Sequence, residues 1–351
     1  MPDLSYARLV FPLLRHLDPE TAHERTLTAL ALAQSNVAGH ALLRSIAGHI
    51  PQQPVLIGRL RFPNPIGMAA GFDKDVRVAA GLGLLGFGHV EVGTLTPRPQ
   101  AGNPRPRIFR LPADGALINR MGFPNGGVAA AVPRLRALAI APRDYLLGVS
   151  LGKQKETALE DAARDYIDVM RAVYPYADYL AVNISSPNTP GLRELQGSRF
   201  LTDLLRALID ESRRMAEQHG VPPRPLWVKI APDLSWADLD ETLVVLDGAG
   251  VDGIIVANTT LERGGLTEAA RVETGGLSGR PLLSRALSLV DYVYRQMGRR
   301  LPIIGVGGIS SAADARRMLD AGASVVQTYT ALIYGGPGLP GRILRALADG
   351  A

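Results

Sequence analysis

The sequence predicts an α/β fold, a (β/α)8 TIM barrel preceded by a short N-terminal helical hairpin. Eight apolar runs have the composition of strands, and they begin near residues 65, 90, 145, 179, 226, 253, 302 and 325. Because these runs are rich in Val, Ile and Leu with little polar alternation, both faces of their sheet are expected to lie under helices. Stretches with helical periodicity alternate with the runs, at 158–173, 199–218, 236–247, 283–297, 312–320 and 340–348. A doubly wound open sheet is the alternative, although no GxGxxG follows the first strand.

Composition limits the classes of function. The chain has 351 residues, of which 46% are hydrophobic and 20% charged, so it can bury a large core. It has no cysteine, which excludes disulfides, thiolate metal sites, protein-ligated iron–sulfur clusters and a cysteine nucleophile or base. No metal site is predicted. The net charge of +5 favours anionic partners, but there is no Lys/Arg run and aromatic residues make up 5%, so nucleic-acid binding is not expected.

Residues 1–45 are expected to form the helical hairpin, residues 46–60 a Pro-containing linker, and residues 61–351 the barrel. Apolar residues recur with helical spacing near the start, at Leu9, Val10, Leu13, Leu14 and Leu17. Asp18 and Pro19 then have the types of an N-cap and a first helical residue. No apolar run reaches the ~20 residues of a membrane span, and no signal peptide is recognisable. The hairpin either covers the barrel or places an apolar face in a bilayer, and these residues leave both open.

The stretch NISSPNTPGLRELQ, residues 183–196, follows an apolar strand and is predicted to be a stiff polar loop. Its two prolines remove backbone donors and fix φ, so neither a strand nor a helix can continue through it. Asn183, Ser186, Asn188 and Thr189 provide donors and acceptors without a fixed charge, which suits a flat, amide-rich small molecule. Taken alone, the composition is equally that of an ordinary polar turn.

Two further strand ends favour ligand binding. Lys229 lies within an apolar strand, where an ammonium needs either an anionic ligand at the barrel mouth or a buried acid. We expect Lys229 to contact an anionic ligand. Gly307 and Gly308 after the seventh strand, with Thr330 after the eighth, occupy the positions where barrels bind phosphate on backbone N–H groups. The alternative is that these glycines only form a tight turn.

Eight ordered motifs along the barrel carry a family resemblance. They are AAGFDK (69–74), GTLTPRPQ (93–100), INRMGF (118–123), NISSPNTPGLR (183–193), VKIAPDL (228–234), NTT (258–260), TGGLSGRPL (274–282) and GVGGI (305–309). The chain resembles the quinone-dependent (class 2) dihydroorotate dehydrogenases, flavoenzymes of pyrimidine biosynthesis. The segment DPETAHE, residues 18–24, resembles the N-terminal extension of that class.

The resemblance implies an FMN cofactor and a dihydroorotate site. It assigns FMN to Ala70, Gly71, Lys74, Thr94, Asn183, Lys229, Gly279, Gly308, Tyr329 and Thr330. It assigns the substrate to Lys74, Asn119, Arg120, Met121, Gly122, Phe123, Asn183, Asn188, Asn258 and Thr259. The residue types agree, because asparagines match the alternating N–H and C=O groups of the ring and Lys74 matches its carboxylate. Lys229 would lie near the pyrimidine end of the flavin and raise its potential.

The resemblance also implies a mechanism for oxidation of dihydroorotate to orotate in UMP biosynthesis. Ser186 matches the serine base of class 2, where class 1 has a cysteine, and hydride would pass from C6 of the substrate to flavin N5. A serine is a poor base near neutral pH, so it needs a proton acceptor. Thr189 is the candidate relay, and Phe123 would exclude bulk water.

For the second half-reaction, the resemblance implies electron transfer from reduced FMN to a membrane quinone. Residues 1–45 would form the quinone tunnel and contact the membrane, which places the protein peripherally on the cytoplasmic face of the cell membrane. No iron–sulfur partner subunit is expected. His23 matches the extension's motif, whereas Arg143 has no assigned role. Two residues depart from the family pattern, Ser150 in place of asparagine and Ala257 in place of threonine, and both are expected to face the flavin.

Three alternative functions each fit part of the sequence. A fumarate- or NAD-dependent relative is disfavoured by the absence of cysteine and by the hairpin. A lyase or isomerase acting on a phosphorylated substrate would use the glycine-rich turn and Thr330 without a flavin. A non-catalytic membrane scaffold is disfavoured because Lys74, Ser186 and Lys229 are all retained.

Overall fold

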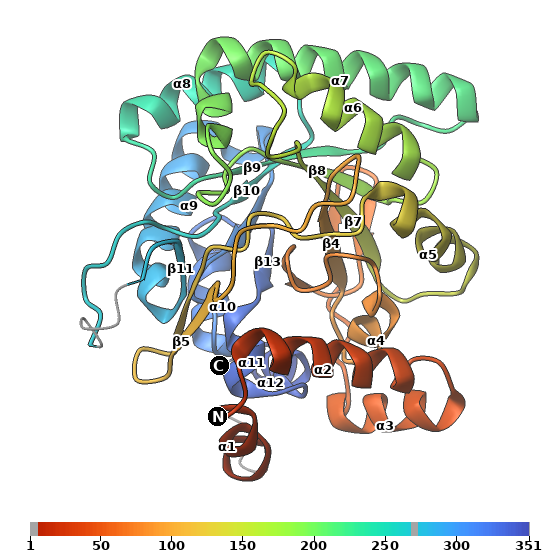
Figure 1. The fold of residues 1–351 in the computed structure, drawn as a ribbon, viewed down its shortest axis with the longest axis vertical. Helices are drawn as coiled ribbons and strands as arrows, with labels where there is room; N and C mark the ends of the chain where they lie inside the picture. Colours follow the sequence, from red (N-terminus) through yellow and green to blue (C-terminus); the bar gives the residue numbers. More distant parts are fainter. Residues whose placement is uncertain (1–5, 268–272, 351) are drawn as a thin grey trace.

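The protein is a closed barrel of eight parallel strands in the computed structural model, which describes residues 6–267 and 273–350. The strands pair in the order β10-β12-β13-β3-β4-β7-β8-β9, and Figure 1 shows the helices around them. The bounds are β3 (Ile66–Met68), β4 (His89–Leu95), β7 (Leu146–Leu151), β8 (Tyr179–Asn183), β9 (Leu226–Ile230), β10 (Gly253–Val256), β12 (Ile303–Val306) and β13 (Val325–Thr328). Each predicted strand is present, and the predicted fold class is confirmed.

Helices cover the outside of the barrel. They are α4 (Ala79–Leu84), α5 (Val128–Ile140), α6 (Ala162–Val173), α7 (Ser198–His219), α8 (Trp236–Ala249), α9 (Leu283–Met297), α10 (Ala312–Asp320), α11 (Thr330–Gly335) and α12 (Leu339–Ala348). Apolar side chains on their inner faces pack with the outward-facing residues of the strands in one large core cluster. The predicted helices agree with these bounds within a few residues. α4 carries the weakest sequence signal, because its sequence AAGLGL contains two residues of low helix propensity.

A second cluster fills the inside of the barrel and is closed at the bottom by a small hairpin. Strand β1 (Val55–Ile57) pairs antiparallel with β2 (Leu60–Phe62). Ile57, Leu60 and Phe62 are buried among the inward-facing strand residues, including Trp227. The segment 46–60 is therefore not the expected linker. Its strands are too short for periodicity to reveal them, but their alternating apolar residues close the barrel floor.

The N-terminal region contains more helix than the predicted hairpin. A π-helical turn (η1, Tyr6–Val10) leads into α1 (Phe11–Leu14), followed by α2 (Pro19–Ala33) and α3 (Val37–Ala47). The expected cap is present, since the Asp18 carboxylate accepts a hydrogen bond from Thr21 N at 2.9 Å. The added helix α3 runs past the expected boundary at residue 45. Figure 1 shows α2 and α3 beside α4 and the C-terminal helices.

One face of this region packs on the barrel domain, while the exposed part carries several large apolar side chains among polar ones. Ala22, Leu27, Leu30 and Leu43 are buried. Several large apolar side chains remain exposed, namely Leu9, Leu13, Leu32, Val37 and Leu42. Within residues 6–267 and 273–350, no helix has both the length and the apolar character needed to cross a membrane.

A three-stranded antiparallel sheet joins two distant insertions at the mouth of the barrel. Strands β5 (Ile108–Leu111) and β6 (Ala116–Asn119) follow β4, and β11 (Gly276–Gly279) follows β10. The order is β11-β6-β5, with Gly276 opposite Asn119. Leu111, Ile118 and Leu277 form its own small core.

Candidate active site

A cavity of about 490 Å³ lies at the carboxyl ends of the barrel strands and is bordered by the three-stranded sheet. This is the end where barrels of this type carry their sites. All the site residues predicted from the sequence line it except Arg120 and Thr189. They are Ala70, Gly71, Lys74, Thr94, Asn119, Met121, Gly122, Phe123, Asn183, Ser186, Asn188, Lys229, Asn258, Thr259, Gly279, Gly308, Tyr329 and Thr330.

One side of the cavity, here the asparagine wall, consists of Asn119, Asn183, Ser186, Asn188 and Asn258. The asparagines are held by one another and by hydroxyl groups. Asn188 Nδ2 donates to Asn119 Oδ1 at 3.1 Å, and Asn258 Nδ2 donates to Asn183 Oδ1 at 3.4 Å. Asn183 Nδ2 also donates to Thr94 Oγ1 at 2.8 Å. Their amide groups are therefore fixed in position before any ligand binds.

Ser186 lies in the loop after β8 and is buried, with 6% of its surface exposed. Its Oγ accepts a hydrogen bond from Asn188 N at 3.3 Å, and it lines the cavity. Thr189, three residues further on, is also buried but does not line the cavity. Among the described residues, Thr189 Oγ1 has no hydrogen-bond partner. The predicted relay therefore has no direct Ser186–Thr189 hydrogen bond in this structure.

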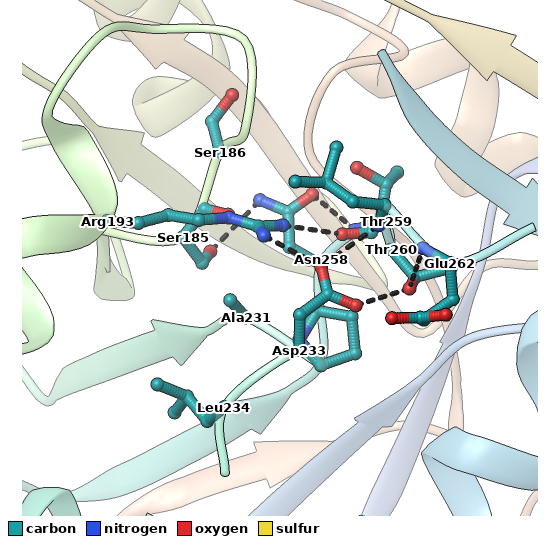
Figure 2. Close-up of polar contacts among 12 residues, drawn as sticks. Ser185, Ser186, Arg193, Ala231, Asp233, Leu234, Asn258, Thr259, Thr260 and Glu262 are labelled. Carbon is teal, nitrogen blue, oxygen red and sulfur yellow. Dashed lines mark hydrogen bonds and ion pairs between the residues drawn. The ribbon is translucent and has the colours of Figure 1, made fainter. Parts of the chain in front are cut away.

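An ion pair that the sequence did not reveal braces this loop from behind. Arg193 Nη1 pairs with Asp233 Oδ2 at 2.7 Å, as Figure 2 shows. The same guanidinium donates to Ser185 O at 3.0 Å and to Thr259 O at 2.9 Å. Asp233 in turn accepts from Thr260 Oγ1 and from Leu261 N. One arginine thus joins the loops after β8, β9 and β10, next to Ser186 and Asn258.

In Figure 2 the Ser186 side chain points away from this cluster, whereas Ser185 and Asn258 point into it. Asn258 Nδ2 donates to Ser185 Oγ at 3.0 Å. The brace therefore acts on Ser186 through its backbone and leaves its hydroxyl free for the cavity. Arg193 belongs to the motif NISSPNTPGLR. The sequence signal for the ion pair was an Arg after a Pro-rich loop together with an Asp after the next strand.

The expectation for the side chain of Arg120 needs correction. Its guanidinium pairs with Glu273 at 2.9 Å and lies over the Phe109 ring, 4.6 Å from the centroid, instead of lining the cavity. Asn119, the last residue of β6, lines the cavity, whereas the side chain of Arg120, which follows the strand, turns away. The Arg120 carbonyl still contributes, because Asn103 Nδ2 donates to it at 3.0 Å and to Asn188 O at 3.0 Å.

Lys74, in the loop after β3, supplies a cation to the cavity. Its ammonium donates to Gly71 O at 2.6 Å. Burial lowers the pKa of Lys74 to about 8, against the opposing effect of the carboxylates of Glu20 and Glu24. His23 of α2 packs edge-on against Phe72 at 5.2 Å, and burial lowers its pKa to about 3, so the imidazole is neutral. Arg143, for which no role was predicted, pairs with Asp178 outside the cavity.

The opposite side, here the glycine wall, consists of Gly279, Gly307 and Gly308 with Ser278 and Thr330. The three glycines have φ values of +98°, +132° and +72°. A Cβ on Gly308 would lie 2.6 Å from Leu283 Cβ. Ser278 Oγ and Thr330 Oγ1 are 2.8 Å apart. This wall therefore presents backbone and hydroxyl groups, the chemistry that binds phosphate.

The two departures from the family pattern differ in position. Ala257 lines the cavity, as expected, and contributes only backbone and a methyl group. Ser150 is fully buried and does not line the cavity. Its Oγ lies 2.9 Å from Thr94 Oγ1, so Ser150 supports Thr94 from behind.

Lys229 has the buried acid that was the alternative to a ligand, and its contact with a ligand stays a prediction. It lines the cavity, and its ammonium lies 3.6 Å from the carboxylate of Glu91, a fully buried residue of β4. The sequence did not single out Glu91. Its signal was an acid within the apolar run VEVGTL, which is as unusual in a buried strand as the lysine.

Comparisons with known proteins agree with this geometry. A family model described as dihydroorotate dehydrogenase matches residues 54–350. The chain is 50% identical to the dihydroorotate dehydrogenase (quinone) of Chloroflexus aurantiacus, over 98% of this chain and 96% of that protein. It is 48% identical to the enzyme of the same name from Acidithiobacillus ferrooxidans, over 98% and 94%.

Solved structures extend the similarity to three dimensions. The crystal structure of the Eimeria tenella DHODH in complex with ferulenol superposes with a TM-score of 0.84 at 37% identity, covering 95% of this chain and 91% of that one. The ligand-free form superposes with a TM-score of 0.80 at 39% identity, over 88% and 93%. The chain therefore belongs to the quinone-dependent dihydroorotate dehydrogenase family.

Proposed function

We propose that this protein oxidises dihydroorotate to orotate with bound FMN and passes the electrons to a membrane quinone. One observation carries the proposal. A single cavity combines Ser186, the asparagine wall and Lys74 with a wall of glycines and hydroxyl groups. The first set matches a carboxylated cyclic amide and the second a phosphorylated cofactor, and the relatives of this chain are named for that reaction.

The residues of the cavity fit FMN. Gln327, which lines the cavity, carries a buried polar atom, Oε1, that has no hydrogen-bond partner among the described residues. Such atoms in a native protein are normally satisfied by a ligand or water. Gly308, Gly279 and Thr330 would hold the phosphate, while Lys229, Thr94 and Asn183 would hold the ring system. When bound, FMN would supply the hydride acceptor, its N5 atom.

Dihydroorotate would lie against the asparagine wall. Each asparagine offers one acceptor and two donor hydrogens, so the set can match the alternating amide groups of the ring. Lys74 would bind the carboxylate through a charge-assisted hydrogen bond. Because the asparagines already form hydrogen bonds with one another, their side chains lose little conformational freedom when the substrate binds.

Ser186 would act as the base that removes the C5 proton of dihydroorotate. Its burial and its place on the cavity wall support this role. Thr189 would carry the proton onward, with a water molecule between the two hydroxyl groups because no direct bond joins them. Phe123 lines the cavity beside Gly122 and would limit access of bulk water.

The N-terminal helices would provide the quinone and membrane contact. The exposed leucines Leu9, Leu13, Leu32 and Leu42 give them an apolar surface. The cavity is also lined by Tyr334 and Leu339, from the part of the fold beside these helices. We place the protein on the cytoplasmic face of the cell membrane, without an iron–sulfur partner subunit.

The test is an anaerobic absorbance spectrum of the purified protein before and after addition of dihydroorotate. The proposal expects a yellow protein that bleaches with dihydroorotate and regains its colour with a soluble quinone, but not with fumarate or NAD⁺. A yellow protein that ignores dihydroorotate would contradict the substrate. A colourless protein that binds no added FMN would contradict the cofactor and favour a phosphorylated substrate.

A further inference from the structure

The interior of the barrel contains a buried ion pair directly beneath the cavity. Lys229 Nζ of β9 lies 3.6 Å from Glu91 Oε1 of β4, and both side chains are almost completely buried. The other carboxylate oxygen, Oε2, accepts from Gln327 Nε2 at 3.0 Å and from Tyr179 OH at 3.4 Å. Oε1 has no hydrogen-bond donor among the described residues and so faces the ammonium as an electrostatic partner.

The other titratable groups beside this pair are neutral. His89 lies two residues before Glu91 on the same face of β4, and burial lowers its pKa to about 3. Burial also raises the pKa of Tyr179 well above its usual value, so the phenol keeps its proton. The local charge under the cavity is therefore decided by Lys229 and Glu91 together.

We propose that Glu91 is a positioning residue that holds the Lys229 ammonium at the cavity wall and offsets its charge, so that it sets the reduction potential of the bound flavin. The inference rests on the proposed function. Reduction makes a flavin more negative, which a nearby cation favours and a nearby anion opposes. Lys229 alone would favour the reduced form, and Glu91 limits that effect.

The surroundings of Glu91 fix the position of its carboxyl group. Gln327 Nε2 and Tyr179 OH both donate hydrogen bonds to Oε2, which leaves Oε1 facing the Lys229 ammonium. A buried ammonium without a charged partner destabilises the folded protein, so Glu91 stabilises Lys229 at this position. Gln327 also lines the cavity, which connects the carboxylate to the ligand through one side chain.

The experiment is a charge cycle on the holoenzyme, with the potential measured by anaerobic reductive titration against a reference dye. E91Q removes the anion, K229M removes the cation, and the double variant removes both. We expect E91Q to shift the flavin equilibrium at least tenfold toward the reduced form, about 30 mV for a two-electron couple. K229M should shift it in the opposite direction, and the double variant should return close to the wild-type potential.

This cycle separates charge from structure, because a packing defect would not give shifts of opposite sign that cancel. E241Q, an exposed acid on α8, is the matched control and should keep the wild-type potential. If E91Q does not fold, E91D tests the same point, because the shorter side chain draws the anion away from Lys229 and should give a smaller shift in the same direction.

An E91Q potential equal to or more negative than that of the wild type would overturn the inference while the proposed function stands. The same holds if E91D, used in its place, shows no shift. A wild-type protein without flavin would overturn both. Flavin content, read from absorbance before each titration, distinguishes these cases.

Discussion

The two walls of the cavity are built in different ways. The asparagine wall consists of side chains that bond one another and are braced by Arg193 and Asp233. The glycine wall consists of backbone, with positive φ at Gly279, Gly307 and Gly308 and few side-chain bonds. The asparagine wall is therefore suited to recognise a ligand by fixed side-chain geometry, whereas the glycine wall is suited to bind a ligand that approaches the main chain closely. Substitutions should therefore separate chemistry and substrate binding from cofactor binding.

Ser186→Ala is expected to have the largest effect. Loss of a general base typically costs about 10²- to 10⁴-fold in rate. Flavin reduction by dihydroorotate, followed by stopped-flow absorbance, should slow by that order while FMN content stays at the wild-type level. Ser288→Ala, on the exposed face of α9, is the control. Reduction of Ser186→Ala near the wild-type rate would show that another group is the base.

Gly308→Ala should instead damage the glycine wall. A Cβ there would lie 2.6 Å from Leu283 Cβ, at a φ of +72° that L-residues rarely adopt. Strain of this kind costs roughly 1–3 kcal/mol, so FMN affinity should fall about 10- to 100-fold. Fluorescence titration of the apoprotein with FMN measures it. Gly248→Ala, where the added Cβ meets open space, should bind FMN normally. Equal FMN affinity in both variants would show that the glycine wall does not bind FMN.

Asp233→Asn tests the brace behind the asparagine wall. It removes the charge that pairs with Arg193 and weakens its contacts with Thr260 and Leu261. Hydrogen bonds to charged groups contribute about 2 kcal/mol, so orotate affinity should fall roughly 30-fold with a lowered Tm. FMN affinity should change little. Asp203→Asn, an exposed residue of α7, is the control, and loss of FMN and orotate binding together would argue for general unfolding instead.

A pH dependence of orotate binding should follow from Lys74. Its pKa is lowered to about 8, so its ammonium is present below pH 8 and lost above it, while the orotate carboxylate stays ionised. Orotate affinity, measured by perturbation of the flavin spectrum, should be about tenfold weaker at pH 9 than at pH 7. Lys74→Arg keeps its charge over this range and should give a flat profile. A wild-type profile just as flat would remove Lys74 from carboxylate binding.

Ser150→Ala should have the smallest effect. It removes one neutral hydrogen bond to Thr94, worth about 1 kcal/mol, while Asn183 still donates to Thr94 at 2.8 Å. FMN affinity should weaken severalfold at most, and the reduction rate should be unchanged. A colourless variant would show that Ser150 matters to the flavin far beyond its place behind Thr94.

The barrel could be predicted because its signals are local. Each buried strand is a continuous apolar run, and each helix between strands shows its own periodicity. The hairpin β1–β2 escaped prediction because its strands have three residues each, too few to establish a period. The third N-terminal helix was not predicted because Ser35 and Asn36 interrupt the pattern after Ala33, yet Asn36 is the N-cap of α3 and does not end the helical region.

The positions of most cavity residues followed from family motifs, but their partners did not. Arg193 and Asp233 are 40 residues apart, and their contact depends on how three loops meet above the barrel. Glu91 and Lys229 lie on different strands, so only the closed barrel brings them together. The outward direction of Arg120 could not be predicted either, because its partner Glu273 lies 153 residues further along the chain.

The sheet at the barrel mouth has a consequence for the order in which the chain matures. Strand β6 pairs with β11, and Ser278 Oγ donates to Leu117 O across 161 residues of sequence. During synthesis, β5 and β6 leave the ribosome long before β11. Leu111 and Ile118 therefore stay exposed until Leu277 has been synthesised and packs against them. A nascent or truncated chain that ends before Gly276 therefore displays an unpaired strand edge and an apolar surface, the features that chaperones bind. Pairing of β11 with β6 ends that exposure and adds Gly279 to the cavity wall.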